Sequence, residues 1–518
     1  MTTDSLTADA PKTDAARRVI LASSLGTVFE WYDFYLYGSL AVFFGGLFFP
    51  PGNETASFLA SLATFGAGFA VRPFGALVFG RLGDLAGRKH TFLLTILIMG
   101  FSTIGVGLLP TYATAGMAAP VLLVFLRLLQ GLALGGEYGG AATYVAEHAP
   151  DQHRGRDTSW IQTTATLGFF LSLAVILATR TALGEEAFKS WGWRVPFLVS
   201  ALLLAVSVYI RFKLEESPVF LAMKSHGKGS KAPLRETFAE PANRRLLLLA
   251  LFGAAASQGV VWYAGQFYAL FFLQNVLKVD FRTAYILIAT ALLLGTPFFI
   301  VFGTLSDRIG RRSIMMTGCI LSALTLIPIF KGLTHFANPK LEAAAAASPV
   351  ILRGPRTGEG LVAREYLAKR GIPYVSQDGA LVSAKIGSVE LPGYDAAAYA
   401  ATLAAAGYPE AADPALINKP MVVLLLFILL LYVAMVYGPI AAFLVELFPA
   451  RIRYTSMSFP YHIGNGWFGG FLPLIASWVV VRTGDIYAGL WYPIGIAAMT
   501  AAVSALYLRE TKQHKIAD

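Results

Sequence analysis

The sequence has little charge, one cysteine and seven histidines in 518 residues. Only 14% of its residues are charged, against about 25% in soluble domains, so a soluble globular protein is excluded. The lone cysteine, Cys319, cannot form an internal disulfide. There is no H-E-x-x-H pair, no G-x-x-x-x-G-K-[ST] phosphate loop and no G-x-S-x-G nucleophile turn. These absences argue against a metal site, an ATP-driven pump and an enzyme.

Apolar residues, in contrast, make up 56% of the chain, and several apolar runs exceed the roughly 18 residues that indicate a bilayer-spanning helix. Apolar runs and helix breakers together predict twelve spans. We place them at 19–47, 55–80, 90–110, 117–147, 157–180, 191–212, 245–275, 283–306, 313–331, 420–444, 454–481 and 487–508. The predicted fold class is therefore an all-α polytopic membrane protein.

The distribution of basic residues predicts the orientation of these spans. With the N-terminus inside, the inner segments hold 24 Lys and Arg residues and the short outer segments hold 5. The positive-inside rule then puts the N-terminal tail (1–18), the linker (213–244) and the C-terminal tail (509–518) in the cytoplasm. The tail 1–18 lacks the pattern of a cleaved signal peptide. We expect a bacterial inner membrane protein whose net charge of +10 needs no nucleic-acid partner to explain it.

Residues 332–419 interrupt the pattern, because they are too polar to span a membrane and far longer than an ordinary helix connection. On the predicted topology this segment lies outside, in the periplasm. The stretches 362–374, 380–389 and 396–407 suggest short helices and strands. We expect a small folded cap.

The chain also contains an internal repeat. The loop pattern G-x-x-x-D-x-x-G-R-K/R occurs at 80–89 and again at 303–312, 223 residues later. A second pair of segments, beginning at Glu147 and Glu446, is 299 residues apart, and the excess matches the insertion. Two six-helix halves, 19–212 and 245–508, are therefore predicted.

The repeated segments supply candidate residues for conformational gating. The glycines permit tight turns, and each aspartate can cap a neighbouring helix end or pair with an arginine across the two halves. The alternative is a basic inner loop that only fixes topology, which two matching copies make less attractive. The candidates are Gly80, Asp84, Gly87, Arg88, Asp307, Gly310, Arg311, Glu147, Arg154, Glu446 and Arg451.

These repeated loops resemble those of the major facilitator superfamily of secondary transporters. More narrowly, residues 24–35, 71–75, 127–131 and 135–140 resemble the metabolite:proton symporters, which include carriers of dicarboxylates, 2-oxoglutarate, citrate, shikimate and betaines. The insertion and residues 22–27 look most like the branch of haloacetate and short monocarboxylate permeases. The resemblance implies two six-helix bundles that rock about a central site.

Charged residues inside the predicted spans are candidates for that site, because ionisable groups in hydrocarbon cost at least about 2.5 kcal/mol each. Glu30 and Asp33 share a helical face, so at least one should hold a proton near neutral pH. Glu137 is a third proton-coupling candidate. Arg72 and Arg127 can each bind a carboxylate, or pair with Asp33 when the site is empty.

Further polar residues on the spans could contact a substrate, although a static charge network and simple packing are the alternatives. The remaining substrate-binding candidates are Tyr35, Gln162, Gln258, Tyr263, Gln266, His462 and Asn465.

We therefore expect a cofactor-free transporter, driven by the proton gradient, that imports a small organic anion, most simply a short monocarboxylate such as acetate, haloacetate or lactate. Dicarboxylate, tricarboxylate or 2-oxoglutarate symport is the alternative. Betaine or proline symport is less favoured, since that branch is known for a long C-terminal coiled coil and the tail here has ten residues. A non-transporting receptor is the competing class. No obligate protein partner is evident from the sequence.

Overall fold

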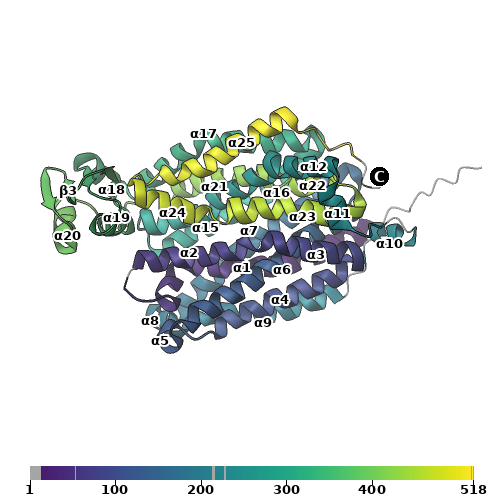
Figure 1. Cartoon of the computed structure of the whole chain (residues 1–518), viewed down its shortest axis with the longest axis horizontal. Helices are drawn as coiled ribbons and strands as arrows, with labels where there is room; N and C mark the ends of the chain where they lie inside the picture. Colours follow the sequence, from purple (N-terminus) through teal and green to yellow (C-terminus); the bar gives the residue numbers. More distant parts are fainter. Residues whose placement is uncertain are drawn as a thin grey trace, which may run out of the picture.

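The computed structural model describes residues 13–52, 54–212, 216, 218–226, 229–514 and 516. In this part of the chain, ten helices are long and apolar enough to cross a membrane, and the bent pair Glu185–Gly192 and Arg194–Ile210 adds an eleventh. The helix α1 (Thr13–Phe48), with 36 residues, is also of spanning length. The predicted helical membrane fold is confirmed for the bundle, whereas the insertion contains a β-sheet (Figure 1).

The helices form two bundles. The first contains α1, α2 (Glu54–Ala70), α3 (Arg72–Ala86), α4 (Arg88–Leu108), α6 (Ala118–His148), α7 (Arg154–Leu183) and α9 (Arg194–Phe212). The second bundle begins with one continuous segment, made of α12 (Pro241–Ala250), η3 (Leu251–Ala255), α13 (Ala256–Tyr263), η4 (Ala264–Tyr268), α14 (Ala269–Phe271) and η5 (Phe272–Val276). It continues with α15 (Phe281–Gly295), α16 (Pro297–Ile309), α17 (Arg311–Ala337), α21 (Lys419–Tyr437), α22 (Ile440–Leu447), α23 (Arg453–Ile463), η7 (Gly464–Gly469), α24 (Leu472–Thr483) and α25 (Trp491–Tyr507). In the linker, the described helices are α10 (Pro218–Ser225) and α11 (Pro233–Ala239). Short helices α5 (Tyr112–Ala115), α8 (Glu185–Ala187) and η2 (Phe188–Gly192) connect spans.

Proline breaks the second span of each half at matching positions. Pro73 starts α3 directly after the turn at Val71, and Pro297 starts α16 after Thr296. Proline lacks the backbone N–H needed to continue a helix and crowds the preceding turn, so a new helix begins at that point. In the first half this break puts Arg72 at the start of α3, in the middle of the span rather than at its end.

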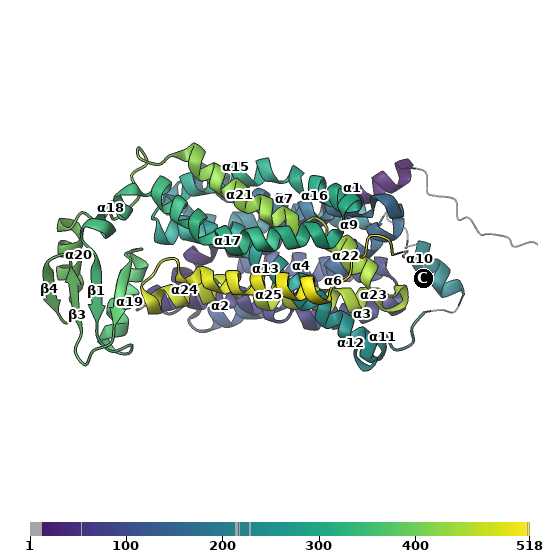
Figure 2. The same ribbon diagram turned by 90° about the horizontal axis from the view of Figure 1, so that it is seen from above.

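The insertion folds as a small α/β module at one end of the bundle, opposite the end marked C (Figures 1 and 2). Its helices are α18 (Pro339–Ala347), α19 (Glu359–Lys369) and α20 (Ala396–Ala405). Its sheet has the order β2-β1-β3-β4, with β1 (Val350–Arg353) parallel to β2 (Tyr374–Gln377) and antiparallel to β3 (Ser383–Ile386), which pairs with β4 (Val389–Pro392). The module begins later than predicted, because α17 continues to Ala337. Its placement outside the cell remains a prediction.

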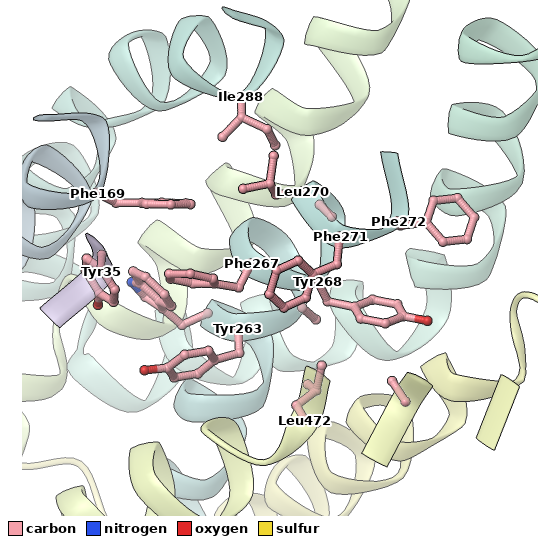
Figure 3. Packing of buried hydrophobic residues seen from close by; sticks show 14 of the residues in the cluster. Tyr35, Phe169, Tyr263, Phe267, Tyr268, Leu270, Phe271, Phe272, Ile288 and Leu472 are labelled. Carbon is pink, nitrogen blue, oxygen red and sulfur yellow. The ribbon is translucent and has the colours of Figure 1, made fainter. Parts of the chain in front are cut away.

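Aromatic side chains join the two halves near the middle of the bundle (Figure 3). The Tyr35 ring from α1 stacks on the Trp262 ring from α13 at a centroid distance of 5.2 Å. Phe169 from α7 stacks on Phe267 from η4 at 4.5 Å. Such pairs contribute about 0.5–1.5 kcal/mol each beyond the burial of their area. The layer therefore holds the halves together in this conformation.

Candidate functional site

Arg72 lies at the centre of the candidate site and is fully buried. Its guanidinium carbon lies 3.9 Å from the centroid of the Phe69 ring and 4.3 Å from that of Phe34. None of its three nitrogens has a hydrogen bond of good geometry among the described residues, although the Tyr263 hydroxyl is close enough to interact with it. Ring faces attract the cation but leave its N–H donors unused. An arginine held in this way can bind an anionic group through two parallel hydrogen bonds.

Tyrosines and a histidine surround this arginine. Tyr35, Tyr263, Tyr437 and Tyr461 interact electrostatically with Arg72, as do His462 and Arg127. The hydroxyls of Tyr437 and Tyr461 are 2.9 Å apart, and neither ring nitrogen of His462 has a hydrogen-bond partner among the described residues. The structure thus brings three sequence candidates, Tyr35, Tyr263 and His462, to Arg72.

A second layer of polar residues supports the tyrosines. Tyr138 stacks on Tyr461 at 3.6 Å and accepts a hydrogen bond of 2.7 Å from Gln162 Nε2. Gln162, another sequence candidate, therefore reaches the site through Tyr138. The sequence reasoning did not select Tyr138 or Tyr437 as site residues. Tyr138 belongs to the motif 135–140 and could have been found there, whereas Tyr437 carries no sequence signal.

The remaining amide candidates divide into two groups. Gln258 and Asn465 hydrogen-bond to each other in both directions, at 3.1 and 2.6 Å. Their side chains thus connect α13 to η7 in this conformation. Gln266, in contrast, is buried, and neither polar atom of its side chain has a partner among the described residues. Gln266 keeps its full capacity to bind a ligand.

Asp33 is buried on α1, and its Oδ1 makes no hydrogen bond in the described part of the chain. Ser200 and Thr103 are its polar neighbours, and Glu30 is the nearest charge that acts on it. A pair of close carboxylates in a buried position favours retention of a proton. This arrangement agrees with the face shared by Glu30 and Asp33 in the sequence.

The predicted ion pair between Asp33 and either Arg72 or Arg127 is absent from the described residues, and this expectation was wrong for this conformation. Arg127 Nη1 instead donates to Gln130 Oε1 at 2.6 Å, and Gln130 Nε2 donates to Thr103 Oγ1 at 2.8 Å. The Arg127 guanidinium also lies 4.5 Å from the centroid of the Tyr37 ring. Because Gln130 is one helical turn away on the same helix, it competes locally for the guanidinium.

Glu137 is buried further along α6, where glycines let other helices come close. A Cβ at Gly135 would lie 2.2 Å from the carbonyl oxygen of Arg72, and one at Gly139 would lie 1.7 Å from Ser458 Oγ. These positions cannot hold a larger residue without movement of α3 or α23. The glycines therefore set the contacts between α6 and both α3 and α23.

The repeated loops lie at the end of the bundle opposite the module, and each aspartate caps a helix of the other half. Asp84 Oδ2 accepts hydrogen bonds from the backbone N–H and the hydroxyl of Thr455 on α23, at 3.1 and 2.7 Å. Asp307 accepts from the backbone N–H groups of Gly155 and Arg156 on α7, at 2.8 and 2.9 Å. A carboxylate at a helix N-terminus is stabilised by the free N–H groups and the helix dipole.

Glycine conformation confirms the tight turns at Gly87 and Gly310, whereas the turn predicted at Gly80 was wrong, because Gly80 lies inside α3. Gly87 has a φ of 115° and Gly310 a φ of 110°, and residues with a side chain rarely adopt this region. A Cβ at Gly80 would lie 3.1 Å from the Cα of Thr455, so α3 and α23 are closely packed. The helix of Arg88 is described, but its side chain is outside the described residues.

Buried ion pairs accompany these caps. Glu446 Oε1 lies 2.9 Å from both Arg154 Nη1 and Arg311 Nη2, and Glu147 Oε1 lies 3.3 Å from Arg453 Nη1. Arg451, the residue that the sequence pattern selected, instead contacts Glu236 of α11 at 3.0 Å, with half of its side chain exposed. The buried position equivalent to Arg154 is therefore Arg453. Both follow their glutamate by seven residues.

Known proteins share this fold and much of this sequence. The profile of the family described as "Sugar (and other) transporter" matches residues 19–248. The inner membrane metabolite transport protein YhjE of Escherichia coli K12 is 32% identical over 97% of this chain and 96% of its own length. The proline/betaine transporter of Salmonella typhimurium is 38% identical over 61% of this chain and 64% of its own length. The alpha-ketoglutarate permease of E. coli K12 is 34% identical over 65% and 78%, respectively.

Among solved structures, the xylose transporter XylE from E. coli, in a partially occluded inward-open conformation, aligns with a TM-score of 0.63. The alignment covers 97% of this chain and 100% of that one at 15% identity, which shows a shared fold. The chain belongs to the sugar (and other) transporter family. It is a multi-pass membrane transporter and not an enzyme.

Proposed function

We propose that the chain imports a small organic anion together with protons by alternating access. The observation that carries this proposal is the unpaired guanidinium of Arg72, buried between the two halves with His462 and four tyrosines around it. A carboxylate in this position compensates a buried charge that otherwise rests on ring faces alone. Rocking of two repeats about such a midplane site is the general mechanism of these folds.

A short monocarboxylate is the substrate that fits this environment best. One fully unpaired arginine meets one carboxylate, and the rings of Phe34 and Phe69 next to it offer an apolar surface for a small body. A dicarboxylate needs a second cation. Arg127 is the candidate, but Gln130 already takes one of its N–H groups. The name of the alpha-ketoglutarate permease keeps dicarboxylates as an alternative within the same class.

Betaine or proline is a second candidate, supported by the same residues in another way. The carboxylate of a zwitterion can also bind Arg72, and aromatic faces such as those of Tyr35 and Trp262 attract a quaternary ammonium group. The proline/betaine transporter among the relatives favours testing this option directly.

Access to the site is expected from the module end of the bundle. A cavity of about 680 Å³ opens there between the two halves, with Phe43 and Phe58 on one wall and Phe271 and Phe272 on the other. Phe267 lies between this cavity and the site, with its ring 6.3 Å from that of Phe271 and 5.9 Å from that of Tyr263. The opposite end is held closed by the caps of Asp84 and Asp307.

Proton coupling is assigned to the carboxylates on α1, with Asp33 as the principal group. Because no cation pairs with Asp33 in the described residues, its protonation can respond to the opening of the site. Binding of a monovalent anion with one proton leaves the loaded site with no added charge, which permits the halves to rock across the membrane.

The test is to place the purified protein in liposomes and record internal pH. Acetate, chloroacetate, lactate, succinate, 2-oxoglutarate and betaine are added in turn, and passive entry of weak acid is subtracted with protein-free vesicles. Protein-dependent acidification with a short monocarboxylate supports the proposal. A response only to dicarboxylates or only to betaine would show that the substrate is that compound and not a monocarboxylate. No response to any of these compounds favours a receptor.

A further inference from the structure

Basic residues gather where the α/β module meets the bundle. Among the described residues that line the cavity of about 680 Å³, the charged ones are Lys189, Lys278 and Lys369, and none is acidic. They come from three parts of the chain: η2 of the first half, the loop before α15 of the second half, and α19 of the module. Lys189 pairs with Glu185 at 3.5 Å, so anions entering between the halves meet mainly the positive charge of Lys278 and Lys369.

Lys278 and Lys369 also line a second cavity of about 380 Å³, which lies against the module. Tyr366, Tyr408 and Arg370 are further members of its wall, and Glu410 is the acidic one. The Glu410 carboxylate lies 3.7 Å from Arg370, and 86% of the side chain is exposed. Lys278 and Lys369 thus line both cavities, and the Glu410 carboxylate contacts Arg370.

The backbone at Lys278 is held in an unusual conformation. Its φ of 55° is the one positive value among the described residues other than glycine. The backbone N–H of Ala412 donates to the Lys278 carbonyl at 3.0 Å, and Asn338 Nδ2 donates to the carbonyl of Leu277 at 3.0 Å. The Lys278 ammonium donates to the carbonyl of Lys369. Contacts that maintain such a conformation are typical of functional positions.

The module itself is fastened to the second half. Tyr374 donates through its hydroxyl to the carbonyl of Val481 at 2.5 Å and through its backbone to Gly484 at 3.0 Å. Lys369 therefore moves with the second half, while Lys189 moves with the first. Rocking of the halves will change the separation of these charges.

We propose that Lys278 and Lys369 form an anion-receiving site at the junction of module and bundle, which binds small carboxylates before they pass to Arg72. The passage to Arg72 rests on the proposed function, whereas the anion site itself does not. Burial, together with the charges of Lys369 and Arg370, lowers the pKa of Lys278 to about 8. A bound anion offsets this repulsion among cations.

A thiol placed in the cavity tests the site without any transported substrate. Ser477 lines the cavity, and Cys319 is buried and the sole native cysteine. In a Cys319→Ala, Ser477→Cys chain, the labelling rate is measured with an anionic and a cationic methanethiosulfonate reagent, each normalised to a free thiol. We expect the anionic reagent to react faster than the cationic one. The ratio of the anionic to the cationic rate should fall about threefold or more in the double variant Lys278→Met, Lys369→Met.

Two further variants separate charge from structure. Lys278→Arg keeps a cation and a donor and is expected to preserve the labelling ratio. Lys385→Met removes an exposed module lysine from β3, away from both cavities, and should leave the ratio unchanged. An unchanged ratio in the double methionine variant overturns the site.

Uptake then tests the role of the site in transport. The double methionine variant should show a raised KM for the transported carboxylate with kcat unchanged, and the difference should shrink in high salt. If the double methionine variant shows a lower labelling ratio but a normal KM, the anion site stands and its role in substrate capture is overturned. Absence of carboxylate uptake by the wild-type chain contradicts the proposed function and leaves the labelling result standing.

Discussion

Asp84 of the first half caps α23 of the second half through Thr455, with hydrogen bonds of 3.1 Å to the backbone and 2.7 Å to the hydroxyl. Asp307 of the second half caps α7 of the first half in the reciprocal manner. The two contacts belong to matching loops, so two equivalent helix caps connect the halves at the same end of the bundle. Transport of the proposed kind requires both to open together.

Removing the charge of one cap should weaken this closure. Asp84→Asn loses charge-assisted hydrogen bonds, which contribute about 1.5–3 kcal/mol each, and Asp307→Asn should act alike. We expect at least about a tenfold shift toward the conformation open at this end. Spin labels at the exposed positions 81 and 451, in a Cys319→Ala chain, report the distance between α3 and the start of α23. Glu342→Gln, in α18 of the module, is the control, and an unaltered distance distribution in both asparagine variants contradicts the role of the caps.

Arg453 and Arg451 should differ sharply in their effect on stability. Arg453 is buried, contacts Glu147 and donates to the carbonyls of Phe448 and Ile516 at 3.1 and 2.9 Å. Removal of one partner from a buried pair costs about 3–5 kcal/mol, whereas the exposed pair of Arg451 contributes about 1 kcal/mol or less. Thermal unfolding of Arg453→Ala and Arg451→Ala in detergent should show a large loss of Tm only for the first. Equal losses would refute the distinction.

Asp33→Asn should separate transport from proton coupling. The amide cannot carry the coupled proton, so accumulation driven by a pH gradient should be abolished. Exchange of labelled for unlabelled substrate across the membrane needs no net proton movement and should persist. Both are measured in the same liposomes, and normal accumulation by the variant removes Asp33 from its proposed role.

The labelling ratio at position 477 should depend on pH through Lys278. Its pKa of about 8 lies below the ordinary value for lysine, so the ammonium loses its charge between about pH 7 and 9. The charged groups that face it are Lys369, Arg370 and Glu410. The advantage of the anionic reagent should therefore fall with a midpoint near pH 8. Lys278→Arg should keep the advantage, and a pH-independent ratio in the wild-type background would contradict this assignment.

Local patterns in the sequence predicted the features that depend on local chemistry. Length and hydropathy located the spans, and Gly87 predicted a turn, because both depend on neighbouring residues. The residue type of Asp84 predicted a helix cap, although the helix that it caps is 371 residues away in the sequence. The repeat then placed Asp307 and Gly310 by symmetry. The gathering of Tyr35, Tyr263 and His462 around Arg72 was expected only in outline.

Features that depend on competition between partners escaped prediction. Gln258 hydrogen-bonds to Asn465, and these two groups meet only in the packed structure. Gln130 accepts from Arg127 one turn away on the same helix, where it competes with Asp33 for the guanidinium. The sequence pattern ends at Arg451, whereas the structure places Arg453 in the buried ion pair. The seven-residue spacing from Glu147 to Arg154 pointed to Arg453, and the repeat contained this information.

The central claim is that the Arg72 guanidinium receives the carboxylate, and calorimetric titration of purified protein tests it most directly. The ligand is the compound that gives uptake, and the proteins are wild type, Arg72→Gln and, as a control, Arg180→Gln, whose arginine pairs with Glu185 near the module end. Loss of a charge-assisted, two-bond contact should lower the affinity of Arg72→Gln about tenfold or more. Affinity equal to that of the wild type would contradict the claim.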